Sequence, residues 1–231
     1  MAKHIFVALL CFSSAVACAS VPPVSAFGRA VEVHTPEAAA LVEELPPIAP
    51  SAPKAKSEPA PLPAGESCLA KLTELGIAFR TLPERRGVET PIIVEGPIGG
   101  VRYHAYGAVP LICDCRLALA LFQVSPLLTS LDITGARFSG AYVYRRTRSG
   151  RPSLHARGLA IDIHELSSKS GRFSVKHDFE RGLPEPCGPG LPLLNTVACR
   201  LRASSLFREL LTPDSDPDHH DHFHLGIAQK G

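Results

Sequence analysis

The sequence lacks a strong excess of charge of either sign. Its 24 lysine and arginine residues and 22 aspartate and glutamate residues leave a formal net charge of +2 at pH 7. Proteins that bind nucleic acids usually carry a larger basic excess, so the composition argues against that class. The sequence also lacks an apolar run of about 18 residues, the length that a membrane-spanning helix needs. It shows no internal repeat.

The first twenty residues lack acidic side chains and have the pattern of an export signal. Lys3 supplies a positive start, and residues 5–17 form a mostly apolar run that is too short to span a membrane. Ala15, Val16 and Ala17 make an A-x-A cleavage pattern. We therefore predict a signal peptide over residues 1–18. Because Cys18 follows the cleavage pattern directly, a lipoprotein signal with an acylated Cys18 is an alternative.

The next segment, residues 19–65, lacks the apolar side chains that a core requires. Of the 22 prolines, 10 lie between Pro22 and Pro63. Such a stretch offers little apolar burial to offset the entropy of ordering, so we predict a disordered tether rich in proline and alanine. Residues 66–231 remain for one globular domain, which is long enough to bury a core. We expect this domain in the periplasm or cell envelope, attached to a membrane only through a lipid on Cys18.

Export places the cysteines of the domain in an oxidising compartment, where disulfides are commoner than zinc thiolates. The five that remain after Cys11 and Cys18 are Cys68, Cys113, Cys115, Cys187 and Cys199. An odd number leaves one thiol that is free, pairs with Cys18 or bonds to another chain. A bridge between Cys113 and Cys115 would be strained. We predict a Cys187–Cys199 disulfide, and a second one from Cys68 to one of the C-x-C pair.

Hydrophobic periodicity predicts both helices and strands in the domain. The expected helices span residues 68–76, 116–131 and part of 192–211, with Pro126 bending or breaking the second of them. The expected strands are 77–82, 91–95, 133–138, 142–146, 158–165, 172–176 and 222–228. Strand and helix do not alternate regularly, so we predict an α+β fold with helices packed on a small antiparallel sheet.

A first group of polar residues lies in the segment SLHARGLAIDIH, which begins at Ser153. In a strand that starts at Gly158, Asp162 lies on the face opposite to the aliphatic residues. His155 precedes Asp162 by seven residues, across a turn that Gly158 makes easy. His164 shares the face of Asp162, but we expect it to be an ordinary surface histidine.

A second group lies in the segment DHHDHFHLG, residues 218–226. In a strand, His222 and His224 share one face, while Phe223 and the next apolar residue turn to the core. Imidazole and carboxylate groups are suitable zinc ligands, and a catalytic zinc site uses three protein ligands while a water takes the fourth position. His155, Asp162 and one of the two histidines would supply those three ligands.

Together these two segments resemble those of bacterial extensin-like C-terminal domain proteins. More widely, the chain resembles the zinc D-Ala-D-Ala metallopeptidase group, which shares a core with lysostaphin-type peptidases and the hedgehog signalling domain. The shared signature is H-x6-D followed by H-x-H, and the resemblance covers residues 68–228. It implies a Zn²⁺ ion bound by His155, Asp162 and His224.

The resemblance also implies roles for neighbouring residues. Asp221 matches the usual general base, and His222 matches a residue that stabilises the oxyanion or orients the water. His219 would assist. A G-x-Y-x-x-R element ends at Arg145, which would contact a substrate carboxylate or the developing oxyanion.

The cysteines depart from the extensin-like pattern. That pattern has one cysteine directly before the arginine and another near the start of the second strand. Here Tyr144 and, approximately, Thr90 occupy those positions. The family's disulfides therefore do not carry over to this chain, although the metal signature is intact.

The ligand pattern predicts a metal-activated water. The resemblance implies that the protein is a zinc-dependent peptidase of the cell envelope that acts on peptidoglycan peptides, and we expect it to be monomeric. An alternative is a non-catalytic, zinc-stabilised domain that binds the wall or another protein. A purely structural wall protein is disfavoured, because the proline-rich segment lacks the serine-proline repeats of plant wall extensins.

Overall fold

The computed structural model describes residues 61–107 and 109–228 of the chain. The predicted signal peptide, Cys18 and the tether up to residue 60 lie outside these residues. Among the described residues, none of the helices is both long and apolar enough to cross a bilayer.

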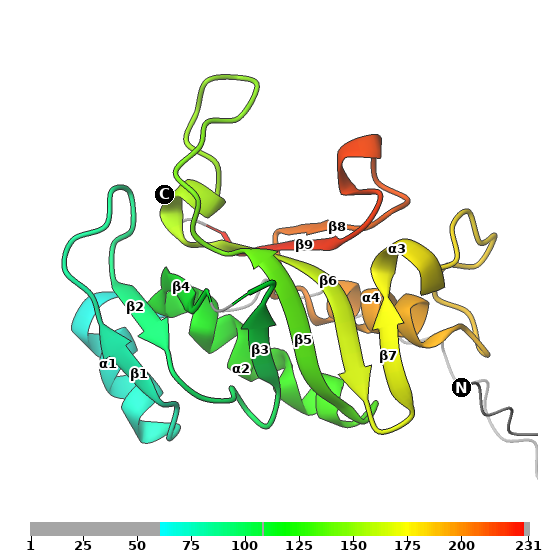
Figure 1. Ribbon diagram of the computed structural model, residues 1–231, viewed down its shortest axis with the longest axis horizontal. Coiled ribbons are helices and arrows are strands. Elements are labelled where there is room, and N and C mark those ends of the chain that lie inside the picture. Colours follow the sequence, from blue (N-terminus) through cyan, green and yellow to red (C-terminus); the bar gives the residue numbers. More distant parts are fainter. Residues whose placement is uncertain (1–60, 108, 229–231) are drawn as a thin grey trace, which may run out of the picture. The chain divides into compact units, whose positions relative to one another are not determined.

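Helices and strands follow one another without a regular rhythm along the described chain (Figure 1). The α-helices are α1 (Gly65–Glu74), α2 (Cys115–Thr129), α3 (Val175–Asp178) and α4 (Leu193–Ser204), and two 3-10 turns are η1 (His155–Arg157) and η2 (Pro217–His219). The strands are β1 (Phe79–Thr81), β2 (Pro91–Val94), β3 (Arg102–Ala105), β4 (Leu111–Asp114), β5 (Ile133–Gly140), β6 (Ala160–Ser168), β7 (Gly171–Ser174), β8 (Glu209–Leu211) and β9 (Phe223–Gly226). The predicted α+β class is confirmed.

The larger sheet has six strands. Five follow the order β3-β5-β6-β9-β8, and the sixth, β7, pairs with residues 165–168 of β6, whereas β9 pairs with residues 160–163. It is not purely antiparallel, because β3 and β5 run parallel. Parallel neighbours need a long crossover, and β4 and α2 provide it. The smaller sheet, β1-β2-β4, is antiparallel. Strands β3, β4 and β8 were not among the predicted elements.

Helices α2 and α4 cover one face of the larger sheet, and α1 packs on α2 (Figure 1). The core between them includes Leu117 and Leu121 of α2, Ile161 of β6 and Leu225 of β9, all at most 2% exposed. Side chains alternate along a strand. Asp162 and His224 therefore lie on the opposite face from this core.

The predicted strand at residues 142–146 is wrong. The segment belongs to the long connection between β5 and η1, where only Arg146 forms an isolated bridge, to Pro152. Strand β5 already pairs with β3 on one side and β6 on the other. A hairpin partner after Gly140 would have no free edge to join.

Two helix predictions are resolved by the structure. A helix within residues 192–211 is confirmed as α4, which ends at Ser204 with Ser205 in the left-handed conformation, and the last residues of that range form β8. Of the bend or break expected at Pro126, a break does not occur, because α2 continues to Thr129. Pro126 has no N–H to donate to the Phe122 carbonyl, and Ser125 Oγ donates to that oxygen instead, at 2.7 Å.

Both predicted disulfides are confirmed. Cys187 pairs with Cys199, and Cys68 pairs with Cys115, the second member of the C-x-C pair. Cys113 is fully buried in β4 and has no disulfide partner among the described residues. Burial raises the pKa of its thiol far above the ordinary value.

Candidate metal centre

The pairing of β6 with β9 brings the aspartate and a histidine together. Asp162 is the direct cross-strand partner of His224. Directly opposed residues in an antiparallel pair have side chains on the same face and close to one another. The Oδ1 atom of Asp162 lies 2.9 Å from Nδ1 of His224. A one-residue slip in this register would separate the two groups, so the sheet itself positions two of the three residues of the site.

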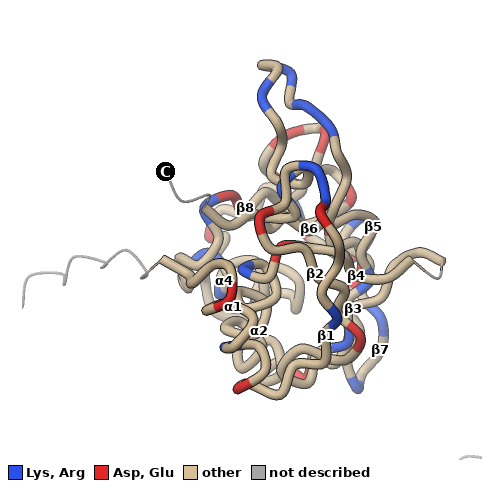
Figure 2. The backbone as a smooth tube through the Cα atoms, turned by 90° about the vertical axis from the view of Figure 1, so that its left-hand side faces the viewer, with Lys and Arg blue, Asp and Glu red and all other residues tan. Residues whose placement is uncertain are grey.

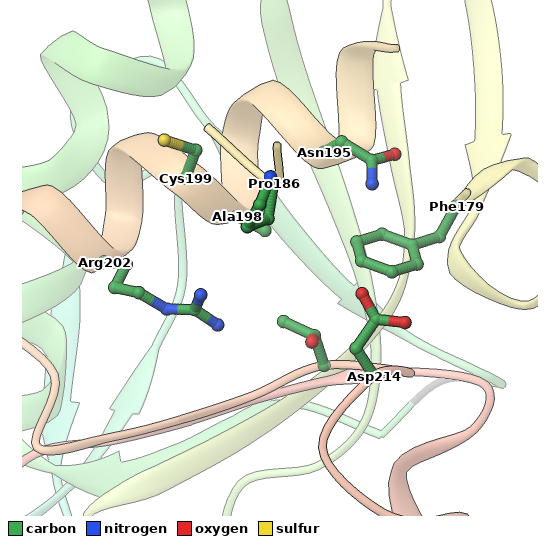
Figure 3. Close-up of a pocket in the computed structure, with 8 residues that line it drawn as sticks. Phe179, Pro186, Asn195, Ala198, Cys199, Arg202 and Asp214 are labelled. Carbon is green, nitrogen blue, oxygen red and sulfur yellow. The ribbon is translucent and has the colours of Figure 1, made fainter. Parts of the chain in front are cut away.

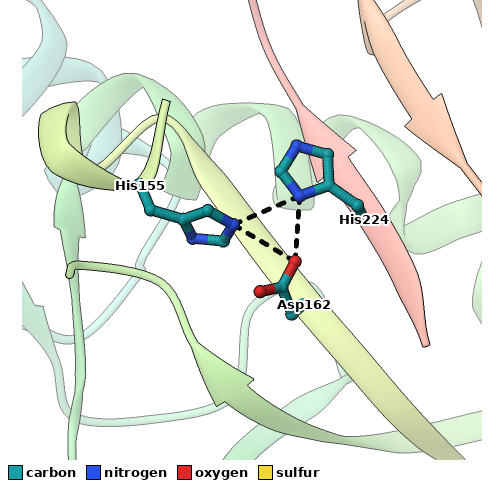
Figure 4. A group of neighbouring side chains, drawn as sticks. All are labelled: His155, Asp162 and His224. Atoms are coloured by element: carbon teal, nitrogen blue, oxygen red, sulfur yellow. Dashed lines mark hydrogen bonds and ion pairs between the residues drawn. The ribbon is translucent and has the colours of Figure 1, made fainter. Parts of the chain in front are cut away.

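A tight turn brings His155 to the same point. The 3-10 turn η1 ends at Gly158, which has a φ of 66°, a conformation that favours glycine. A β-carbon at this position would lie 2.6 Å from the backbone nitrogen of Asp114. The turn directs Nε2 of His155 to 3.2 Å from both Asp162 Oδ1 and His224 Nδ1 (Figure 4).

The three atoms fit a metal ion both in chemistry and in spacing. Two nitrogens and one carboxylate oxygen lie 2.9–3.2 Å from one another. In a tetrahedral zinc site with bonds of about 2.0–2.2 Å, neighbouring ligand atoms are about 3.3 Å apart. His155, Asp162 and His224 are also buried, at 1%, 8% and 6% exposure. Such a set of ligands is able to hold a divalent transition metal.

The electrostatics of the centre keep its carboxylate ionised. Burial raises the pKa of Asp162, but hydrogen bonds from His155 and His224 outweigh burial and hold that pKa well below its ordinary value. A charged carboxylate is the form that binds a metal. The outer nitrogen of His224, Nε2, faces Glu209 Oε2 of β8 at 3.4 Å. Carboxylates in this position orient metal-binding histidines.

Asp221 and His222 lie beside the three-residue centre. Nδ1 of His222 is 2.8 Å from Asp221 Oδ1, and Nε2 of the same ring is 3.5 Å from Asp162 Oδ1. Partial burial raises the pKa of Asp221, but the hydrogen bond with His222 and the charge of His164 outweigh it and give a net lowering. His222 thus links an accessible carboxylate to the buried centre.

Arg145 and His219 lie at the edge of the centre. Arg145, in the connection after β5, places a guanidinium nitrogen 3.8 Å from Asp162 Oδ2 and is mostly exposed. His219 in η2 is held by Asp216, whose Oδ1 lies 2.8 Å from its Nδ1, and its ring lies 5.6 Å from the ring of His224. Both are placed to contact a molecule that reaches the centre from solvent.

His164 differs from the sequence-based expectation of an ordinary surface histidine. Its side chain is only 18% exposed, and its ring lies 5.0 Å from that of His222. Burial and the neighbouring His222 lower the pKa of His164. The sequence did carry a signal for this position, because the alternation of side chains along β6 places His164 on the same face as Asp162. Glu209 had no comparable local signal, because β8 itself was not predicted.

A separate small pocket lies between α4 and the chain after β8 (Figure 3). Its lining includes Arg202, Asp214 and the amide of Asn195. That amide is already paired with both backbone groups of Glu180. None of the residues predicted for the site lines this pocket. The polar residues of the motifs therefore converge elsewhere, on the face of β6 and β9.

Residues 66–231 match the family model described as extensin-like protein C-terminus. The chain belongs to this extensin-like family. No curated protein and no solved structure matches the chain. All residues of the candidate centre lie within the extensin-like domain, and its two disulfides are typical of an oxidising compartment.

Proposed function

We propose that the extensin-like domain is a zinc-dependent hydrolase of the cell envelope that cleaves peptide bonds of peptidoglycan. The observation that carries this proposal is the convergence of three ligand atoms within 3.2 Å, next to a carboxylate that remains accessible. His155, Asp162 and His224 would hold the ion. The likeness of the two motifs to the zinc D-Ala-D-Ala metallopeptidase group supports the same assignment.

Zinc, when bound, supplies Lewis-acid activation of a water and of the scissile carbonyl. Asp221, ionised and 31% exposed, accepts a proton from the attacking water as its oxygen adds to the amide carbon. The same carboxyl group then returns the proton to the leaving amine as the carbon–nitrogen bond breaks. His222 fixes the orientation of Asp221 through its Nδ1 atom.

Arg145 would bind a substrate carboxylate or the developing oxyanion. Its guanidinium is exposed, and a planar fork of donors suits two carboxylate oxygens. Stem peptides of peptidoglycan end in carboxylates and contain D-amino acids, so they are the substrate class that we propose. We expect the protein to act in the periplasm or envelope as a monomer, attached to a membrane only through a lipid on Cys18.

The burial of the ligands favours a second candidate function. His155, Asp162 and His224 are at most 8% exposed and come from η1, β6 and β9, so a bound ion would hold these three segments together. In that case the ion would stabilise a domain that binds the wall or another protein without cleaving it. Asp221 separates the two functions, because only the hydrolase needs its carboxylate for turnover.

The test uses the purified full chain loaded with zinc and isolated peptidoglycan, with the products identified by mass. We expect cleaved stem peptides from the native protein and a loss of at least about 100-fold in rate for Asp221→Asn, since general-base catalysis contributes about 10²–10⁴-fold. The variant should retain the ion held by His155, Asp162 and His224. Glu74→Gln, an exposed carboxylate on α1, is the matched control. Intact peptidoglycan with zinc-loaded native protein would support the structural alternative.

A further inference from the structure

A second group of metal-ligating side chains lies next to the first. His164, Asp221 and His222 offer two imidazoles and a carboxylate, with ligand atoms within 4.8 Å of one another. Their side chains are 13–31% exposed, so an ion from solvent can reach them. The proposed hydrolysis uses Asp221 and His222 but leaves His164 without a role.

His164 is held in the orientation of a metal ligand. Its Nε2 atom lies 2.8 Å from Ser139 Oγ of β5, and its Nδ1 atom lies 3.9 Å from Asp221 Oδ1. A histidine that binds a metal commonly donates its other ring N–H to a fixed partner. With Nε2–H donating to Ser139, the lone pair of Nδ1 is directed toward Asp221. The ring of Tyr106 packs against that of His164 in a T-shaped arrangement, with the ring centroids 5.8 Å apart.

His222 has the same two-sided arrangement. Its Nδ1 atom lies 2.8 Å from Asp221 Oδ1, while Nε2 faces the carboxylate of Asp162 at 3.5 Å. When the ring proton is on Nε2 and directed to Asp162, Nδ1 no longer donates to Asp221 and its lone pair can bind an ion. The distances from Asp221 Oδ1 to the two imidazoles, 2.8 and 3.9 Å, lie on either side of the separation of about 3.3 Å expected in a tetrahedral site.

We propose that His164, Asp221 and His222 form a second, weaker site for divalent zinc, and that an ion bound there inhibits hydrolysis. The site is weaker than the first because its ligands are more exposed and converge less closely. Inhibition follows because the ion occupies Asp221 and His222. This last step rests on the proposed hydrolase function, whereas the binding of the second ion does not.

The test measures zinc bound by the full chain at fixed free zinc concentrations, with equilibrium dialysis and metal analysis. We expect the native protein to bind one ion tightly and a second at higher free zinc. His164→Ala should keep the first ion and weaken the second at least about 10-fold, and Ser139→Ala should weaken only the second by a smaller factor. His177→Ala, an exposed histidine on α3, should behave as the native protein does.

The two proposals fail in different ways. An equal zinc-binding curve for the native protein and His164→Ala would overturn the second site, whatever the activity. If a second ion binds and depends on His164 but the protein never cleaves peptidoglycan, the second site is supported and the proposed hydrolase function is contradicted. If both hold, excess zinc slows the native enzyme but leaves the rate of His164→Ala unchanged.

Discussion

At the scale of single residues, the centre depends on a few contacts that each need one side chain. Asp162 Oδ1 faces His155, His224 and His222 at once, at 3.2, 2.9 and 3.5 Å. A carboxylate that accepts hydrogen bonds from two buried imidazoles has a lowered pKa, because the bonds favour its charged form. The same residue therefore contributes to stability without any bound metal.

A pH titration of the metal-free protein tests this contribution. The folded-state pKa of Asp162 lies below the unfolded value of about 3.9, so its stabilising effect is present above that pH and lost as the pH falls further. We expect the free energy of unfolding of the native protein to fall more steeply below about pH 4 than that of Asp162→Asn. Urea unfolding between pH 3 and 6 with a chelator measures this. Parallel pH profiles for the two proteins would contradict it.

At the scale of elements, the register of two strands and the position of two helices decide the site. Strand β6 holds Asp162 and His164, and β9 pairs with it so that His224 lies opposite Asp162. Helices α1 and α2 are joined by a disulfide from Cys68 to Cys115, the first residue of α2. Asp114, which caps α2, lies against Gly158 of the turn that positions His155.

The two disulfides should differ in their contribution to stability. Cys68–Cys115 closes a separation of 47 residues and Cys187–Cys199 one of 12. In the chain-entropy account these loops correspond to about 4 and about 3 kcal/mol. We expect Cys68→Ala/Cys115→Ala to lower the free energy of unfolding more than Cys187→Ala/Cys199→Ala, as measured by urea unfolding. A larger loss for the second pair would rule out this order.

At the scale of the whole molecule, the described residues carry positive charge on one long loop. The connection of residues 141–154 contains Arg145, Arg146, Arg148 and Arg151 and no acidic residue, and Figure 2 shows lysine and arginine positions gathered along the uppermost loop. Arg148 pairs with Asp218 at 2.6 Å. Arg145 lies at the edge of the centre, and Arg146 and Arg151 are exposed on the same loop, so an anionic polymer would be attracted to this side of the domain.

We therefore expect Arg146→Gln/Arg151→Gln to bind isolated peptidoglycan several-fold more weakly than the native protein at low salt. The deficit should shrink near 0.15 M salt, where the screening length falls to about 8 Å from about 30 Å at 0.01 M. Sedimentation of the protein with peptidoglycan measures the bound fraction. Lys71→Gln/Arg80→Gln, which removes two exposed charges from α1 and β1, serves as the matched control. An equal loss in both double variants would exclude a specific role for the loop.

Much of the site was predictable because its signals are local. The spacing of His155 and Asp162, the alternation around Asp162 and the H-x-H segment all lie within short stretches of chain. Strands β3, β4 and β8 were missed because each has only three or four residues, and so short a segment shows no clear period. The other strands of this length were found because they overlap longer predicted segments. The contact of Glu209 with His224 could not be predicted either, because Glu209 lies on β8.

The sequence by itself indicated the candidate ligand residues, the turn at Gly158, the α+β class and the pairing of Cys187 with Cys199. Only the tertiary structure decided that Cys115, rather than Cys113, pairs with Cys68, and that His164 joins Asp221 and His222. These outcomes depend on strand register and helix packing between segments far apart in the chain. Local side-chain patterns carry no information on which of several distant segments will come into contact, because that choice is made by the packing of the whole core.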